Sequence, residues 1–269
     1  MSAPGHISAL GRFVGRNRAS FPVRKLAGLC RRYVRWFENL NYDPLTNGER
    51  FVVETLGRFK PAVIVDGGAN VGDWSVMAAA ACPTARIHAF EISPPTFAAL
   101  VEHTAALPAV TPVPKGLSDT PGTIEIRHYD GLSVLTTATA YPHPAPYTVM
   151  PAEVTSIDAY VAAEGLAHID LLKIDVEGME EKVLRGCADL LARGAVDLIQ
   201  FEYGMVNIMF HSLLYDFHNL LEGHGFAVGK IFPDHVRFKP YDFPDEDFLG
   251  PNYLACRRDR ADLLAALSK

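Results

Sequence analysis

The chain has 269 residues, of which 49% are hydrophobic and 21% charged, close to the average of soluble globular proteins. That composition excludes intrinsic disorder, a collagen-like repeat and a small disulfide scaffold. The length provides for one large domain or two small ones with a sizeable buried core.

The formal net charge of −6 is unevenly distributed along the chain. Residues 1–37 contain no Asp or Glu and eight basic residues, which are Arg12, Arg16, Arg18, Arg24, Lys25, Arg31, Arg32 and Arg35. The remainder therefore holds 17 of the 25 basic residues against all 31 acidic ones, a net charge of −14. Because such an acidic body repels phosphates, we expect no nucleic-acid partner.

The cysteines and the N-terminus bear on the compartment. Cys30, Cys82, Cys187 and Cys256 form no C-x-x-C pair and have no His at metal-ligand spacing, so we expect buried free thiols in a reducing cytosol. No apolar run approaches the roughly 18 residues of a membrane-spanning helix. The N-terminus lacks the apolar stretch of a secretory signal, although its Arg-rich composition leaves an organellar transit peptide as an alternative. We expect a cytoplasmic protein.

The apolar spacing predicts an amphipathic helix over Leu26–Leu40 and a second helix over Gly48–Phe59. From there, short β-branched runs alternate with helical segments. The predicted strands are 62–65, 86–90, 110–113, 169–174 and 196–201, the predicted helices are 74–82, 96–106, 179–192 and 213–222, and residues 226–232 and 253–257 form a final antiparallel pair. This alternation predicts a doubly wound α/β sheet.

One stretch interrupts the alternation. Thr123–His128 alternates like a strand, and Tyr147–Val154 is the predicted hairpin partner. Ser133–Pro146 lies between them and has no periodicity. A loop of this length inside a compact domain is usually functional or disordered, so a lid over the substrate and a tolerated insertion both stay open.

The most informative segment is Val63–Ser75, which reads VIVDGGANVGDWS and predicts a strand, a glycine turn and a helix. Ligand atoms can approach the backbone at such a turn and meet the N–H groups of the helix start. Glu91 ends the next strand, 19 residues after Gly72. A carboxylate at that place can accept hydrogen bonds from both hydroxyls of a ribose. Together these features predict an adenosine-containing cofactor.

The turn also discriminates between cofactors. A dinucleotide fingerprint needs glycine where Ala69 stands, whereas Asp66, Gly68, Asn70 and Gly72 fit a D-x-G-x-N-x-G pattern that suits S-adenosylmethionine. No Tyr is followed four residues later by Lys, so the catalytic pair of short-chain dehydrogenases is missing. A nicotinamide-dependent oxidoreductase stays as the alternative. Turn formation alone could account for Asp66 and Asn70, but their coincidence with Glu91 favours a cofactor role.

A second motif follows in Ile169–Gly178, which reads IDLLKIDVEG. Its predicted strand delivers Lys173, Asp175 and Glu177 to the carboxyl end, where open α/β sheets bind ligands. Three ionisable groups at a strand end are costly to bury without a function. For Glu177 the alternative is a helix acid in the first turn, stabilised by the helix dipole.

With both motifs in place, the chain resembles the FkbM family of S-adenosylmethionine-dependent methyltransferases. The resemblance rests on the segments Asp66–Gly72, Phe90-Glu91, Leu117–Asp119 with Gly122, Ser156–Asp158 and Asp170–Gly178, between about residues 47 and 203. The chain departs from the family at Gly67, where an apolar residue is usual. It departs again at Ile92-Ser93, where Pro-Asn or Pro-Ser usually follows the ribose acid.

The resemblance implies a Rossmann-like class I methyltransferase fold, with a seven-stranded, mostly parallel sheet whose last strand is antiparallel. We expect a basic N-terminal arm and helix over residues 1–46 and the methyltransferase domain over 47–269, with the loop 130–148 as a candidate lid. By position, Gly68, Asn70 and Gly72 would line the methionine end, Glu91 would hold the ribose and Asp119 would accept from the adenine amino group. The expected cofactor-binding residues are Asp66, Gly68, Asn70, Gly72, Ser75, Glu91, Ile92 and Asp119.

The implied reaction is O-methylation of a hydroxyl on a sugar, a glycan or a secondary metabolite, so the expected partner is a small-molecule or glycan acceptor. Asp175 is the first choice for the base that an alcohol needs, and Lys173 would pair with it or orient the acceptor. The alternative bases are Glu177, Glu202 and His211. We expect no metal, although Asp175 and Glu202 could hold Mg²⁺ together.

A third possible function is a non-catalytic module that binds S-adenosylmethionine. The presence of all three charged residues, Lys173, Asp175 and Glu177, argues against it. The oligomeric state is left open. For the basic arm the sequence offers two roles, docking onto the acidic body or contact with an anionic membrane. Docking is the favoured role, because Trp36, Phe37 and Leu40 would otherwise be exposed.

Overall fold

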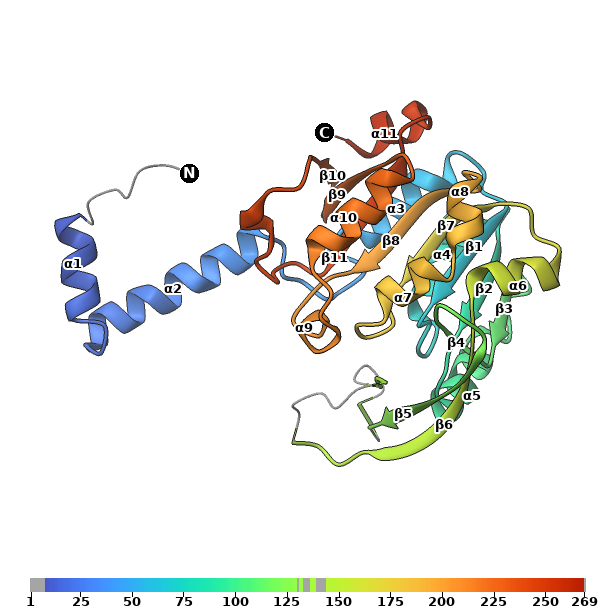
Figure 1. The fold of residues 1–269 in the computed structure, drawn as a ribbon, viewed down its shortest axis with the longest axis horizontal. Coiled ribbons are helices and arrows are strands. Elements are labelled where there is room, and N and C mark those ends of the chain that lie inside the picture. Colours follow the sequence, from blue (N-terminus) through green and yellow to red (C-terminus); the bar gives the residue numbers. More distant parts are fainter. Residues whose placement is uncertain (1–7, 130, 133–135, 139–143, 269) are drawn as a thin grey trace.

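The computed structural model describes residues 8–129, 131–132, 136–138 and 144–268 (Figure 1). Its centre is an eight-stranded sheet in the order β10-β9-β11-β8-β7-β1-β2-β3. The strands are β1 (Val63–Gly67), β2 (Arg86–Phe90), β3 (Val110–Val113), β7 (Ile169–Ile174), β8 (Val196–Glu202), β9 (Phe226–Phe232), β10 (His235–Phe238) and β11 (Asn252–Arg257).

The pairing within this sheet confirms the predicted fold class. Strands β3, β2, β1, β7 and β8 are parallel, and β11, the last strand along the chain, pairs antiparallel with both β8 and β9. These strands and β9 are the seven that the sequence predicts. The short β10 is an eighth strand, not predicted, which returns from β9 through the turn Pro233-Asp234 and pairs with it antiparallel.

Helices cover both faces of the sheet (Figure 1). On one face α3 (Glu49–Gly57), α4 (Asp73–Ala81), α5 (Pro94–Thr104) and α11 (Ala261–Leu267) pack in a core with Ile64, Leu171 and Leu198. On the other face α6 (Ile157–Glu164), α7 (Glu180–Arg185), α8 (Ala188–Ala192) and α10 (Leu214–Gly223) pack against Leu172 and Phe201. Strands buried on both faces explain the continuous apolar runs in the sequence.

A smaller sheet flanks the main one near β2 and β3 (Figure 1). It contains β4 (Gly116–Leu117), β5 (Gly122–His128) and β6 (Thr148–Thr155) in the order β4-β6-β5. The predicted hairpin is confirmed, because β5 and β6 pair antiparallel from Gly122 opposite Val154 to His128 opposite Thr148. In the connecting loop, residues 130, 133–135 and 139–143 lie outside the described residues, so the predicted lid is described only at 131–132, 136–138 and 144–147.

The predicted helix 179–192 is two helices, α7 and α8. Helix α7 ends before Gly186, where a Cβ would lie 2.2 Å from the backbone oxygen of Ser118. Helix α8 then begins, and the carboxylate of Asp158 caps its first turn by accepting from the N–H groups of Asp189 (2.8 Å) and Leu190 (3.1 Å). A capping residue that lies so far away in sequence is not visible to a periodicity argument.

The N-terminal arm consists of α1 (Ala9–Arg16) and α2 (Phe21–Phe37), which project away from the body (Figure 1). No residue of either helix is buried, so the expected docking of this arm onto the body is wrong. Helix α2 also begins and ends earlier than predicted. It ends before Asn39, which adopts the left-handed backbone conformation (φ 57°).

The remaining short helices are α9 (Asn207–Phe210) and a 3-10 turn over Phe243–Asp245. All four cysteines are free as predicted. The expected burial is confirmed for Cys82, Cys187 and Cys256 and is wrong for Cys30, which is exposed on α2 because that helix projects from the body. Among the described residues, no helix has both the length and the apolar character needed to cross a membrane.

Candidate active site

The register between β1 and β7 places two charged residues side by side. Asp66 lies opposite Lys173, and the Lys173 Nζ is 3.1 Å from Asp66 Oδ1 and 3.4 Å from Asp175 Oδ2. Its ammonium also lies 5.5 Å from the ring centroid of Trp74. Burial lowers the pKa of Lys173, but the charges of Asp66, Asp175 and Glu49 outweigh burial and raise that pKa above its ordinary value. The lysine is therefore a permanent buried cation that holds the two aspartates.

The glycine turn after β1 is fixed by close contact with the end of β7. Gly68 has a φ of +78°, and a Cβ on it would lie 1.7 Å from the backbone oxygen of Asp175, so no other residue fits. The N–H groups of Gly68 and Ala69 donate to the Phe90 carbonyl at 3.1 and 2.7 Å. The turn is thereby held between the ends of β2 and β7.

Glu91 faces this turn from the end of β2. Its Oε2 accepts from the N–H of Asn70 (3.0 Å) and its Oε1 from the N–H of Ser93 (2.8 Å). Burial raises the pKa of Glu91 to about 7, against the lowering effect of the two N–H donors. The carboxyl group is thus rigidly oriented and titrates close to neutral pH.

A strained loop follows β7. Glu177 (φ 54°) and Gly178 (φ 100°) are both left-handed, which is uncommon for a glutamate. The loop is held by the carboxylate of Glu180, which accepts from the N–H groups of Val176 (3.1 Å) and Gly178 (3.0 Å). Burial raises the pKa of Glu180 to about 7. Sequence reasoning missed this residue, although a carboxylate two residues after a glycine at a helix start is a readable signal.

Three carboxylates converge beside this loop. Oxygen atoms of Asp175, Glu177 and Glu202 lie within 4.8 Å of one another, a denser group than the sequence indicated. Burial, followed by the charges of Asp175 and Glu180, raises the pKa of Glu177 to about 9. Burial and the same acidic neighbours raise the pKa of Glu202 well above its ordinary value. Glu177 therefore holds a proton at neutral pH, whereas Asp175 is paired with Lys173 and is 41% exposed.

These elements enclose a pocket. It brings together six of the predicted residues, and its lining contains Gly68, Asn70, Glu91, Ile92, Asp175 and Glu177. Residues 136–138 form a further wall, where the Thr137 hydroxyl donates to the Glu177 carbonyl at 3.2 Å. Thr137 also pairs with Arg127 of β5. No pattern in the sequence indicates these wall residues, because they lie in the loop without a motif.

Other predicted residues support the pocket from behind. The Ser75 hydroxyl donates to Asp66 Oδ2 at 2.7 Å, and both side chains are buried. Gly72 caps the N-terminus of α4 with a φ of +94°. These two residues and Asp66 hold the turn in place, and none of them lines the pocket.

Two further candidates lie elsewhere. Asp119 is exposed, accepts from the Ser118 hydroxyl at 2.9 Å and shares a separate hollow with Lys182 and Arg185, so its adenine role stays a prediction. His211 is exposed at the C-terminus of α9.

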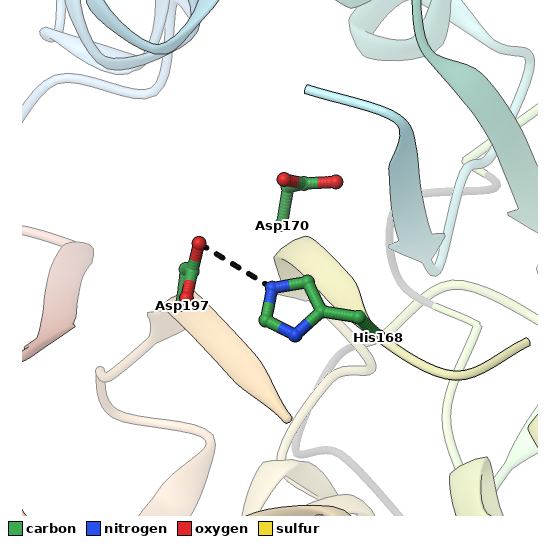
Figure 2. A group of neighbouring side chains, drawn as sticks. All are labelled: His168, Asp170 and Asp197. Atoms are coloured by element: carbon green, nitrogen blue, oxygen red, sulfur yellow. Dashed lines mark ion pairs between the residues drawn. The ribbon is translucent and has the colours of Figure 1, made fainter. Parts of the chain in front are cut away.

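A second group of side chains with metal-ligand atoms lies at the opposite end of β7 and β8. Figure 2 shows His168, Asp170 and Asp197, with a 3.3 Å ion pair between the His168 Nε2 and Asp197. Each aspartate has a structural partner, because Asp197 pairs with Arg260 and Asp170 accepts from the N–H groups at the start of β1. The adjacent arginine disfavours a cation there.

Comparison with known proteins gives one family. The model of the methyltransferase FkbM domain matches residues 66–228. None of the curated proteins compared with the chain matches it.

Among solved structures, the FkbM methyltransferase from Methylobacillus flagellatus KT aligns with a TM-score of 0.44 and 13% identity, over 73% of this chain and 44% of that one, so this chain spans less than half of that protein. The O-methyltransferase TomG from Streptomyces achromogenes, involved in tomaymycin synthesis and solved with SAM, aligns at 0.43 and 10% over 81% and 82%. The plantazolicin methyltransferase BpumL with SAH aligns at 0.42 and 14% over 91% and 94%.

Proposed function

Since this chain belongs to the FkbM methyltransferase family, we propose that it transfers a methyl group from S-adenosylmethionine to a hydroxyl of a sugar, a glycan or a secondary metabolite. One observation carries the proposal. The pocket joins a carboxylate fixed by backbone N–H groups, Glu91, to a carboxylate paired with a buried lysine, Asp175. The first is suited to accept hydrogen bonds from a ribose, and the second is suited to accept the proton of an acceptor hydroxyl.

The residues of the pocket fit this cofactor. Glu91 would accept from the ribose hydroxyls, and the backbone of Gly68 and Asn70 would border the aminoacyl end. The bound cofactor supplies a methyl group on a positively charged sulfur. The carboxylate of Asp175 complements that charge, and Lys173 is the one buried cation among the described lining and supporting residues.

The chain's own contribution is position and proton transfer. Holding two reactants in line accounts for roughly 7–11 kcal/mol of a barrier. A base for the acceptor hydroxyl adds on the order of 10²–10⁴-fold. Asp175 is the proposed base, because it is partly exposed to the pocket while Glu177 carries a proton at neutral pH. Lys173 keeps Asp175 in place from behind and is a positioning residue.

The pocket walls support a hydroxyl-bearing acceptor. Ile124 and Ile126 of β5 provide an apolar side, and Thr136 and Thr137 add polar groups opposite the carboxylates. A mixed lining of this kind suits a small molecule with several hydroxyls and an apolar face. The predicted lid over the acceptor is part of the proposal, supported by the described residues 136–138, which line the pocket and include the Thr137 hydroxyl bonded to the Glu177 carbonyl.

The test is methyl transfer to a panel of sugars and natural-product alcohols, with S-adenosylhomocysteine formation as the readout. Asp175→Asn should retain cofactor binding and lose at least about 100-fold in turnover. Asp189→Asn, an exposed aspartate on α8, is the matched control and should behave as wild type. Unchanged turnover in Asp175→Asn would remove Asp175 from the base role. Binding of S-adenosylmethionine without transfer to any acceptor would favour the non-catalytic module.

A further inference from the structure

The N-terminal arm carries a continuous apolar surface that no part of the described chain covers. On α2 the side chains of Leu26, Leu29, Tyr33, Trp36 and Phe37 are each 59–68% exposed. Their spacing of three and four residues puts them on one side of the helix. Helix α1 adds a shorter apolar side, formed by Leu10, Phe13 and Val14. An apolar surface of this extent is uncommon on a monomeric soluble protein and marks an interaction site.

The opposite side of the arm is positively charged. Arg24, Arg31 and Arg35 alternate in sequence with the apolar residues of α2, and their helical spacing places them on the other side of the helix. Among the described residues no carboxylate forms an ion pair with any of these three. The hollow between the two helices is lined by four cations, Arg18, Arg24, Lys25 and Arg31. Residues 1–37 contain no acidic side chain at all.

The root of the arm is firmly tied to the body. Glu38 accepts from the Lys230 ammonium at 2.8 Å, with Lys230 buried in β9. The Asn39 amide donates to the carbonyls of Asn47 (2.7 Å) and Ile231 (3.0 Å). Helix α2 therefore leaves the body in a defined direction, and α1 lies at a steep angle to it at the end farthest from the body (Figure 1).

We propose that this arm lies on the surface of an anionic membrane. A helix pair with one basic side and an apolar side that includes aromatic residues is suited to the interface of a bilayer, where apolar side chains enter the acyl region and arginines meet phosphates. The charge of the arm matches anionic lipid headgroups, and the acidic body, at −14, would be kept off the surface. The same acidic body disfavours nucleic acid as the occupant.

A vesicle-binding measurement tests this proposal on the full chain. Vesicles of phosphatidylcholine alone are compared with vesicles that also contain phosphatidylglycerol, with no cofactor or acceptor present. The chain should cosediment with the anionic vesicles, and added salt should release it in part. The triple variant Arg24→Glu, Arg31→Glu and Arg35→Glu should bind at least about tenfold more weakly.

Two controls separate membrane binding from other effects. Arg58→Glu, Arg86→Glu and Arg193→Glu together make the same charge change at exposed positions of the body and should leave vesicle binding within about twofold. Trp36→Ser with Phe37→Ser should weaken binding without altering thermal unfolding, because both side chains are exposed.

Three results would overturn the proposal. They are an absence of binding to anionic vesicles, equal loss in the body variant, and a stable dimer in light scattering that Trp36→Ser with Phe37→Ser dissociates. The last result would assign the apolar side to a second copy of the chain. Since the vesicles hold no acceptor, none of these results bears on methyl transfer.

Discussion

At the scale of single residues, the site depends on how burial changes protonation. Glu91 and Glu180 are buried and Glu177 is half-buried, and the pKa values of the three carboxyl groups are raised to about 7, 7 and 9. Lys173 is the only lysine at this centre among the described residues, and its pKa is raised by Asp66 and Asp175 despite burial. The resulting site contains one fixed cation, two acids with pKa values of about 7 and one with a pKa of about 9.

Cofactor affinity should therefore depend on pH through Glu91. Its carboxyl group must be ionised to accept from both ribose hydroxyls, and it is protonated below its pKa of about 7. The dissociation constant for S-adenosylmethionine should then fall roughly tenfold as the pH rises from about 6 to about 8. Calorimetric titration across this interval measures it. In Glu91→Gln the roughly tenfold change of the dissociation constant between about pH 6 and about pH 8 should vanish. If the variant kept the wild-type pH profile, Glu91 would be excluded as the group that causes the pH dependence.

Much of the site could be predicted at this scale. Gly68, Asn70, Glu91 and Asp175 follow neighbouring parallel strands, and the carboxyl ends of such strands meet at one edge of the sheet. Glu180 and Thr137 could not be found the same way, because their role depends on hydrogen bonds to the loop backbone.

At the scale of elements, the glycine turn and the end of β7 are a single packed unit. Gly68→Ala places a methyl group 1.7 Å from the Asp175 carbonyl and forces an alanine into the left-handed region. We expect the free energy of unfolding to fall by about 2 kcal/mol or more, with loss of cofactor binding. Urea denaturation followed by circular dichroism measures the change.

Gly122→Ala is the matched control for this substitution. Gly122 begins β5, a methyl group added there would meet no atom within 4 Å, and its φ is not positive. The stability of this variant should stay within about 0.5 kcal/mol of wild type. Equal effects of the two substitutions would contradict the packing explanation.

The prediction of helices and strands succeeded where their bounds depend on the periodicity of the sequence, and it failed where they depend on contacts with distant residues. The strand 86–90 and the strand 226–232 have the predicted bounds. The break between α7 and α8 depends on Asp158, about 30 residues away, and β10 is too short to have a pattern of its own. For the N-terminal arm the sequence predicted a contact that the structure does not contain. Its apolar residues predicted docking onto the body, and the structure leaves them exposed.

At the scale of the whole molecule, the acidic groups gathered at the site oppose folding at high pH. A carboxyl group whose pKa is raised in the folded state binds more protons folded than unfolded. By linkage, the free energy of unfolding then decreases as pH rises from about 4.5 to the folded pKa, which for Glu177 is about 9.

Glu177→Gln should remove part of this decrease in the free energy of unfolding at high pH. Glutamine has no proton to lose on unfolding, so the variant should melt a few degrees above wild type at about pH 8 and equal it near about pH 4. Differential scanning calorimetry at several pH values measures the difference. Glu125→Gln, an exposed glutamate on β5, should leave the curve unchanged. A Glu177→Gln curve parallel to wild type would contradict the protonation of Glu177 in the folded protein.

The assignment of the pocket to the methyl donor is tested by calorimetric titration of the purified chain with S-adenosylmethionine and, separately, with NAD. We predict micromolar binding of S-adenosylmethionine, at least about tenfold weaker binding in Glu91→Gln, and no measurable binding of NAD. Preference for NAD, or equal binding of S-adenosylmethionine by wild type and Glu91→Gln, would contradict that assignment.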